Sequence, residues 1–390
     1  MRRLLLVAVA SVAMWTQACG GDDSAQVQDA VTDTTASELE VQAEVVEEIA
    51  TPLVDLPWVE MDGGLLTGVK SIKGLACSGS SVFLSVDSSD PETTGTWMLD
   101  LASQQPLTKF FEGYGSIAAT ETGLLVATYG GPNATAAVVL VQPGADAVDQ
   151  GFAVQATEVK ELIYSSGKTI MMAKDWSNAQ YTIFRGGLNA GAFEQLGKTT
   201  DETGMSIYTD GTDLYFLTLL NGTVGAACRQ LPITAGPEDT WVACQGFPEW
   251  VQTKPTDPFS IRAEVFGSGS DMAAWFKVSN KGTNEYHVYA GAAGNYITLP
   301  GFPANEPSAW HHTGSDVLLG YVGGSGKSGA FAASKSGGEP ARDLTEGLLS
   351  PAHEKDGVAA FCQSNKRLVA AWFAFGGGGS TVTLFQKSLD

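Results

Sequence analysis

Residues 207–218 read IYTDGTDLYFLT: a short apolar strand, the turn Asp210-Gly211-Thr212-Asp213, and a second apolar strand. Asp, Gly and Thr form turns because Gly adopts positive φ and short polar side chains bond to nearby backbone groups. The second strand runs on as a nearly continuous apolar stretch to Leu220, which is typical of a strand buried on both faces. The segment therefore predicts a β-hairpin inside a fold.

This hairpin pattern occurs seven times along the chain. The second strands begin, at intervals of 42–58 residues, near Val82, Leu124, Thr169, Leu214, Met272, Val317 and Leu368. A period of about 40–50 residues with four strands in each unit is the pattern of a propeller blade. Residues 56–390 thus resemble the β-propeller families through their repeat, and through no family's catalytic motif.

The resemblance implies an all-β fold, a single seven-bladed β-propeller, with six or eight blades as alternatives. A large β-sandwich or two stacked β-domains is the other architecture that fits the pattern. The last unit ends after three strands, and the apolar segment Leu56–Met61 belongs to no complete unit. We expect this segment to pair antiparallel with Thr381–Gln386, closing the ring and covering an exposed edge.

The N-terminus has the features of an export signal. Arg2 and Arg3 precede an apolar run, residues 4–12, which is too short to span a membrane comfortably. The run leads to TQACGGDD, residues 16–23, which resembles the lipobox of bacterial lipoproteins around Cys19.

This resemblance implies that residues 1–18 are a cleaved signal peptide and that the thiol of Cys19 carries lipid. The protein would then be exported and anchored to the bacterial outer membrane, facing the periplasm or the surface. The sequence departs from the family at Thr16, where Leu is preferred, and at Gln17. An ordinary signal peptide is the alternative.

The charge of the chain limits its partners. The formal net charge is −21, which argues against a nucleic-acid partner because phosphate attraction needs a basic face. Residues 19–55 contain ten Asp and Glu and no Lys or Arg. Such a segment cannot bury enough apolar surface to fold, so we predict a disordered acidic tether between the lipid and residues 56–390.

Four cysteines remain besides Cys19, and an even number in an exported chain favours disulfides. Cys228 and Cys244 fall on the predicted third and fourth strands of one blade. Cys77 and Cys362 occupy matching positions in the first and seventh units, which a closed ring makes neighbours. We therefore predict the bridges Cys228–Cys244 and Cys77–Cys362, with free buried thiols as the alternative.

The sequence contains little that indicates catalysis. His311 and His312 alternate along a predicted strand, so they face opposite ways and do not form a zinc motif. Carboxylate oxygens are the ligands that Ca²⁺ prefers, and they occur close together at Asp87, Asp90 and Glu92. A solvated turn is the better interpretation of this segment. We predict no metal, no cofactor and no assigned catalytic residue, which favours binding over an enzymatic role.

The predicted function is binding of a protein, peptide or glycan through loops at one end of the ring, by a monomer. An envelope assembly scaffold and a propeller-type glycan hydrolase or lyase are the alternatives. The loops at that end span 87–95, 175–178, 247–258 and 301–307. Acidic and aromatic residues on them form the candidate binding face: Asp87, Asp90, Asp175, Trp176 and Trp250. Packing of Trp250 onto its own blade is the alternative.

Overall fold

The computed structural model describes most of the chain beyond residue 56. The described residues are 57–102, 105–128, 136–150, 158–174, 181–188, 193–197, 203–219, 224–245, 250–252, 259–268, 271–280, 283–292, 295–313, 315–323, 328–348, 356–364, 366–376 and 379–389. All of them belong to one compact unit, Ala50–Asp390. Cys19 and the predicted tether lie outside the described residues.

The described strands form seven antiparallel sheets. The first three are β2 (Val69–Ser78), β3 (Ser81–Ser88), β4 (Gly95–Asp100), β5 (Thr108–Phe111); β6 (Gly115–Ala119), β7 (Leu124–Thr128), β8 (Ala137–Val141), β9 (Val148–Asp149); and β10 (Glu158–Ser165), β11 (Lys168–Lys174), β12 (Thr182–Gly187), β13 (Glu194–Gln195). The next two are β14 (Thr203–Thr209), β15 (Asp213–Leu219), β16 (Val224–Pro232), β17 (Val242–Ala243), with β18 (Trp250–Gln252) beside β16; and β19 (Phe259–Ser268), β20 (Asp271–Asn280), β21 (Thr283–Ala292), β22 (Asn295–Thr298). The last two are β23 (Ala309–His312), β24 (Asp316–Tyr321), β25 (Gly329–Ser334), β26 (Arg342–Asp343); and β27 (Gly357–Ser364), β28 (Arg367–Gly376), β29 (Gly379–Ser388), β1 (Val59–Thr67).

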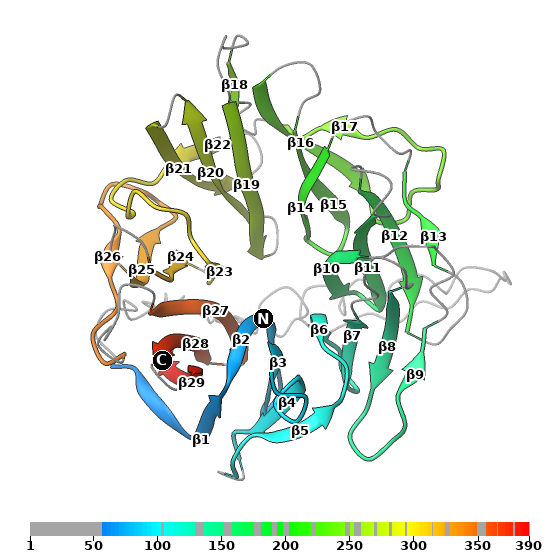
Figure 1. The fold of residues 1–390 in the computed structure, drawn as a ribbon. Coiled ribbons are helices and arrows are strands. Elements are labelled where there is room, and N and C mark those ends of the chain that lie inside the picture. The colour runs from blue at the N-terminus through cyan, green and yellow to red at the C-terminus, as the bar shows by residue number, and fades with distance from the viewer. Residues whose placement is uncertain are drawn as a thin grey trace, which may run out of the picture. The chain divides into compact units, whose positions relative to one another are not determined.

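These sheets are the blades of a β-propeller (Figure 1), numbered 1 to 7 here in the order given. The first strand of each blade faces the centre, and the inner strands contact one another around the whole ring, β27 of blade 7 meeting β2 of blade 1. The predicted seven-bladed all-β fold is confirmed. No helix occurs in the described part of the chain, and hence none there that is long and apolar enough to cross a membrane.

Local chemistry explains the inner hairpins. In blade 4 the carboxylate of Asp210 accepts the amides of Thr212 and Asp213, each at 2.8 Å, and Gly211 has a φ of +90°. In blade 2 Thr120 Oγ1 accepts the amide of Gly123 at 2.9 Å. The amides in the turn have no neighbouring strand to bond to. The polar side chain at the start of the turn accepts their hydrogen bonds instead.

The hydrophobic core lies between neighbouring blades, not at the ring centre. One cluster joins blades 7 and 1 and includes Val82, Leu84, Val369 and Leu384, all fully buried. Others fill the interfaces between blades 2 and 3 and between blades 5 and 6. Because each second strand is covered on both sides, its sequence is apolar on both faces.

The ring closes through the N-terminal strand, as predicted, but the pairing is longer. β1 pairs antiparallel with β29 from Val59 opposite Gln386 to Thr67 opposite Thr381. The observed strand β1, Val59–Thr67, therefore starts later than the expected strand, 56–61, and continues further along the chain. The register shifts between Glu60 and Leu65, because residues 61–64 bulge out of the ladder.

Further contacts fix β1 to the blades on both sides. The indole Nε1 of Trp58 donates to the carbonyl of Leu344 in blade 6 at 2.7 Å. The amide of Leu107 in blade 1 donates to the carbonyl of Gly63 at 2.9 Å. β1 therefore holds three consecutive blades together.

Both predicted disulfides are present. Cys77 on β2 bonds to Cys362 on β27, linking the first and last blades across 285 residues, and Cys228 bonds to Cys244 within blade 4. Two disulfides indicate an oxidising, extracytoplasmic environment.

Candidate functional site

Backbone irregularities recur on the inner strands. The register of β2 shifts between Ile72 and Gly74, and that of β10 shifts between Val159 and Glu161. Similar shifts occur on β14 and β27. A β-bulge re-aims a side chain, and here the extra residues are Lys73 on β2 and Lys160 on β10. Both lysines line the centre of the ring.

The central channel is a hollow of about 610 Å³, lined by inner strands of blades 1, 2, 3, 4 and 6. Three aromatic residues from different blades line it: Tyr164, Tyr208 and Trp310. Tyr164 and Trp310 are half-buried, so their rings are partly accessible, whereas Tyr208 is buried. Ser116, Ser165 and Thr209 also belong to the lining. Ser116 Oγ donates to the carbonyl of Lys160 at 3.0 Å, and Thr209 Oγ1 donates to the carbonyl of Asp213 at 2.7 Å.

Tyr164 is held by a contact between blades. Its hydroxyl bonds to the carboxylate of Glu121 in the inner turn of blade 2. Burial, reinforced by this bond, raises the pKa of Tyr164 to about 12, and the bond lowers the pKa of Glu121. The Tyr164 phenol therefore stays neutral and fixed in place at physiological pH.

Tyr208 and Asp210 form a second ordered group at the inner hairpin of blade 4. The rings of Tyr208 and Tyr215 stack with centroids 5.7 Å apart, and the Tyr215 hydroxyl donates to Asp210 Oδ2 at 3.0 Å. Since Asp210 Oδ1 also accepts two turn amides, this carboxylate is occupied as a structural acceptor.

The other channel carboxylate is also engaged by the backbone. Glu161 Oε2 accepts the amide of Ile207 from the neighbouring blade at 2.6 Å. Lys160 reaches towards the loop end of blade 3, where its Nζ lies 5.7 Å from the centre of the Tyr181 ring. Of the charged residues that line the channel, Lys73 is the one with an exposed side chain.

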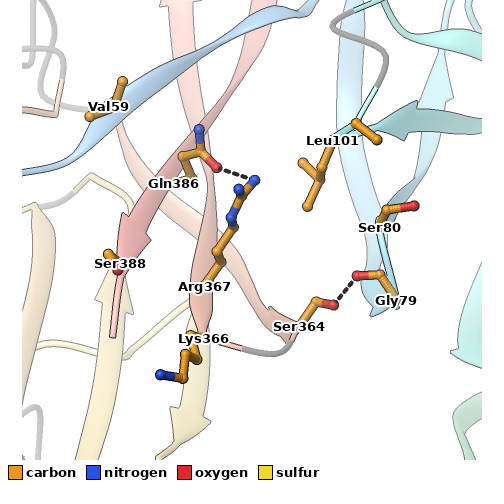
Figure 2. Close-up of a pocket in the computed structure, with 10 residues that line it drawn as sticks. Val59, Gly79, Ser80, Leu101, Ser364, Lys366, Arg367, Gln386 and Ser388 are labelled. Atoms are coloured by element: carbon orange, nitrogen blue, oxygen red, sulfur yellow. Dashed lines mark hydrogen bonds between the residues drawn. The ribbon is translucent and has the colours of Figure 1, made fainter. Parts of the chain in front are cut away.

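A second hollow, of about 540 Å³, follows the closure between blades 7 and 1 (Figure 2). Arg367 reaches towards Gln386, with Nη1 and Oε1 3.3 Å apart, and Leu101 faces it from blade 1. Ser364 Oγ donates to the carbonyl of Gly79 across the two blades. These contacts, next to the Cys77–Cys362 bridge, join the blades at the seam.

The residues predicted for the loop-end binding face are placed only in part. Asp175 and Trp176 lie outside the described residues. The Asp90 carboxylate accepts the amide of Glu92 at 3.0 Å and the hydroxyl of Thr93 at 3.1 Å, so it shapes an exposed turn. Asp87 lies on β3 and is half-buried. The structure does not test whether these residues bind a ligand.

Trp250 differs from the expectation in its backbone. Residues 250–252 form the short strand β18, which pairs with residues 224–226 of β16, instead of an irregular loop. The structure describes only the backbone of Trp250.

Two of the histidines, His311 and His312, lie on β23. His312 is buried, whereas His311 Nε2 lies 3.1 Å from Gln363 Oε1 in blade 7. Burial lowers the pKa of His311, and the Gln363 contact partly opposes this. The described residues contain no group of three or more His, Cys, Asp or Glu placed to hold a metal ion.

Sequence reasoning did not identify the channel residues Lys73, Tyr164, Tyr208 and Trp310. They belong to the inner strands, whose apolar neighbours made them look like core. The signal was the position of each residue within its repeat: Tyr164 and Tyr208 both stand within two residues of the start of their hairpin copies, at Leu162 and Ile207.

No protein-family model matches the sequence, and no curated protein matches it either. Several solved structures share its fold. Hydrazine synthase of Kuenenia stuttgartiensis has a TM-score of 0.52 at 14% identity, over 81% of this chain and 96% of that chain. The polysaccharide lyase Uly1 has a TM-score of 0.51 at 10% identity, over 86% and 99%.

The β-propeller domain of the Trilobed protease from Pyrococcus furiosus has a TM-score of 0.51 at 9% identity, over 83% and 97%. Identities this low show the propeller fold alone. That domain is described as having an open velcro topology, whereas here β1 pairs with the last blade.

Proposed function

We propose that this protein is an exported, lipid-anchored β-propeller that binds a glycan chain in its central channel. The observation that supports the proposal most is the channel lining, which combines the partly accessible rings of Tyr164 and Trp310 with hydroxyl-bearing residues and the exposed Lys73. The C–H faces of sugar rings stack on aromatic rings, and their hydroxyls both donate and accept hydrogen bonds. A channel of about 610 Å³ has room for a short oligosaccharide segment.

Binding fits the channel better than hydrolysis. A glycosidase needs one carboxyl group that donates a proton and a second that acts as base or nucleophile. Glu161 and Asp210 instead accept backbone amides, which occupy their carboxylate oxygens. Both carboxylates are therefore interpreted as parts of the fold.

The proposal is tested by titrating the purified protein with six ligands and measuring dissociation constants by calorimetry. The ligands are cellohexaose, maltohexaose, hexagalacturonate, a hyaluronan hexasaccharide, hexaglutamate and hexalysine. We expect at least one hexasaccharide to bind, and chromatography should recover it at its original length. Binding of the peptides with no binding of the sugars would count against the glycan proposal.

Two pairs of variants locate the binding to the channel. Tyr164→Ala removes a stacking ring and should weaken binding about tenfold, whereas Tyr164→Phe keeps the ring and should stay within about threefold. Lys73→Ala should weaken binding about fivefold, since a charged donor is lost. Lys70→Ala, which changes another exposed lysine on β2 outside the channel lining, should have no effect. Equal affinities for Tyr164→Ala and the unchanged protein would place the ligand elsewhere.

The anchor rests on the sequence resemblance around Cys19. Cys19→Ala should move the protein from the membrane fraction to the soluble periplasmic fraction, because no thiol remains at the signal boundary to carry lipid. The nearby control Ser24→Ala should remain in the membrane fraction. Cell fractionation with mass spectrometry of the N-terminal peptide measures this, and a membrane-bound Cys19→Ala protein would disprove the anchor.

A further inference from the structure

A partly open cavity of about 210 Å³ lies between blades 5 and 6. Aromatic side chains of both blades and of the connecting loop line it, among them Trp275, Tyr286, Phe302 and Tyr321. Trp275 and Tyr321 are 2% and 1% exposed, so their rings form fixed walls. The cavity is smaller than the roughly 300–1,000 Å³ of drug-sized sites, and it suits a single ring.

The lining includes polar atoms of Trp275 and Asn305 that are buried without a hydrogen-bond partner among the described residues. They are the donor Nε1 of Trp275 and the acceptor Oδ1 of Asn305. Buried polar groups are nearly always hydrogen-bonded, so each such atom needs a physical reason. The indole Nε1 of Trp372 is buried in the same way, but Trp372 lines none of the described hollows. What sets Trp275 apart is that a donor and an acceptor line one cavity.

The cavity lining is uncharged in character. Its described residues contain no Asp, Glu, Lys or Arg, and His287 contributes an imidazole to the lining. Burial raises the pKa of Tyr321 far above its usual range, so that phenol stays neutral. A charged ligand would be desolvated there without a counter-charge, which disfavours it.

The loop over the cavity is fixed at both ends. At its start, Gly301 has a φ of +87°, and the amide of Ala341 in blade 6 donates to the carbonyl of Pro300 at 2.8 Å. Near its end, Glu306 forms an ion pair with Lys277 of β20 at 3.2 Å. A loop held in this way keeps the cavity preformed, which lowers the entropy cost of binding.

We propose that this cavity binds a small neutral ring that carries hydroxyl groups, of the size of one sugar residue. A hydroxyl group accepts a hydrogen bond from Trp275 Nε1 and donates one to Asn305 Oδ1, while the apolar face of the ring stacks on the aromatic walls. No residue lines both this cavity and the channel. The two linings do touch, because the rings of Trp275 and Trp310 lie with their centroids 6.3 Å apart.

The test uses methyl glycosides of glucose, galactose, mannose and N-acetylglucosamine, with saturation-transfer NMR titrations of the full-length protein. At least one glycoside should show saturable binding. Trp275→Phe removes the N–H donor and replaces the indole with a smaller apolar ring, a change of shape that the Trp372→Phe control shares, and Asn305→Ala removes the acceptor. Each should weaken binding at least fivefold.

Two control variants show whether the glycoside occupies this cavity. Trp372→Phe removes an equally buried indole N–H outside the cavity, and Tyr164→Ala alters the channel; both should leave the affinity within twofold. If Trp275→Phe does not fold, Asn305→Ala on the half-buried loop carries the test alone. The proposal is wrong if no glycoside binds saturably, if Trp275→Phe and Asn305→Ala bind as well as the unchanged protein, or if Tyr164→Ala abolishes the binding.

Discussion

A chain that begins at Gly68 and so lacks β1 should unfold about 10 °C below the full chain, because it loses several kcal/mol of stability. The truncation removes the buried side chains of Trp58, Met61 and Leu66, each of which stabilises the fold by about 1.5–3 kcal/mol. It also removes the ladder with β29 and the Trp58 bond to Leu344. β29 then becomes an exposed edge, so the truncated protein should also aggregate.

Calorimetric melting curves and light scattering measure both effects. Leu65→Ser is the matched control, since this β1 side chain is 56% exposed and its loss should shift the melting temperature by no more than about 2 °C. Unchanged thermal unfolding of the truncated chain would contradict closure of the ring by β1.

The Cys77–Cys362 bridge should contribute more stability than the Cys228–Cys244 bridge. In the chain-entropy model, a disulfide stabilises by restricting the unfolded chain, and longer loops are restricted more. The two bridges close loops with sequence separations of 285 and 16 residues. The expected contributions are therefore about 5 kcal/mol for the first bridge and about 3 kcal/mol for the second.

Each pair of cysteines serves as the control for the other. Denaturant titrations of Cys77→Ala/Cys362→Ala and of Cys228→Ala/Cys244→Ala compare the free energies of unfolding directly. Equal losses, or a larger loss from the blade 4 pair, would mean that the link between the first and last blades does not restrict the unfolded chain as proposed.

The propeller could be predicted from the sequence because the same hairpin pattern recurs at similar intervals along the chain. Each blade needs a doubly buried second strand and a tight turn, so Leu214 and Val317 stand within one residue of the observed strand starts, Asp213 and Asp316. The incomplete last unit likewise predicted closure by an N-terminal strand. The bulge at residues 61–64 could not be predicted, since it depends on the close packing of the Gly63 backbone against Pro106 of blade 1.

The candidate sites were harder to predict for a physical reason. Lys73 lines the channel because a bulge turns it, and no local sequence signal marks that bulge. Trp275 reads as an ordinary core residue within an apolar run, and its cavity exists only because the loop 301–307 folds over it. Residues from five blades come together in the channel through ring closure, which a linear pattern does not reveal.

The most direct test of glycan binding in the channel is a crystal structure of the protein with the hexasaccharide that binds most tightly in the titrations. We expect sugar density in the central channel, with one ring stacked on Tyr164 and a hydroxyl within hydrogen-bond distance of Lys73 Nζ. Sugar density confined to the seam beside Arg367 or to the loop end, with only water in the channel, would contradict glycan binding there.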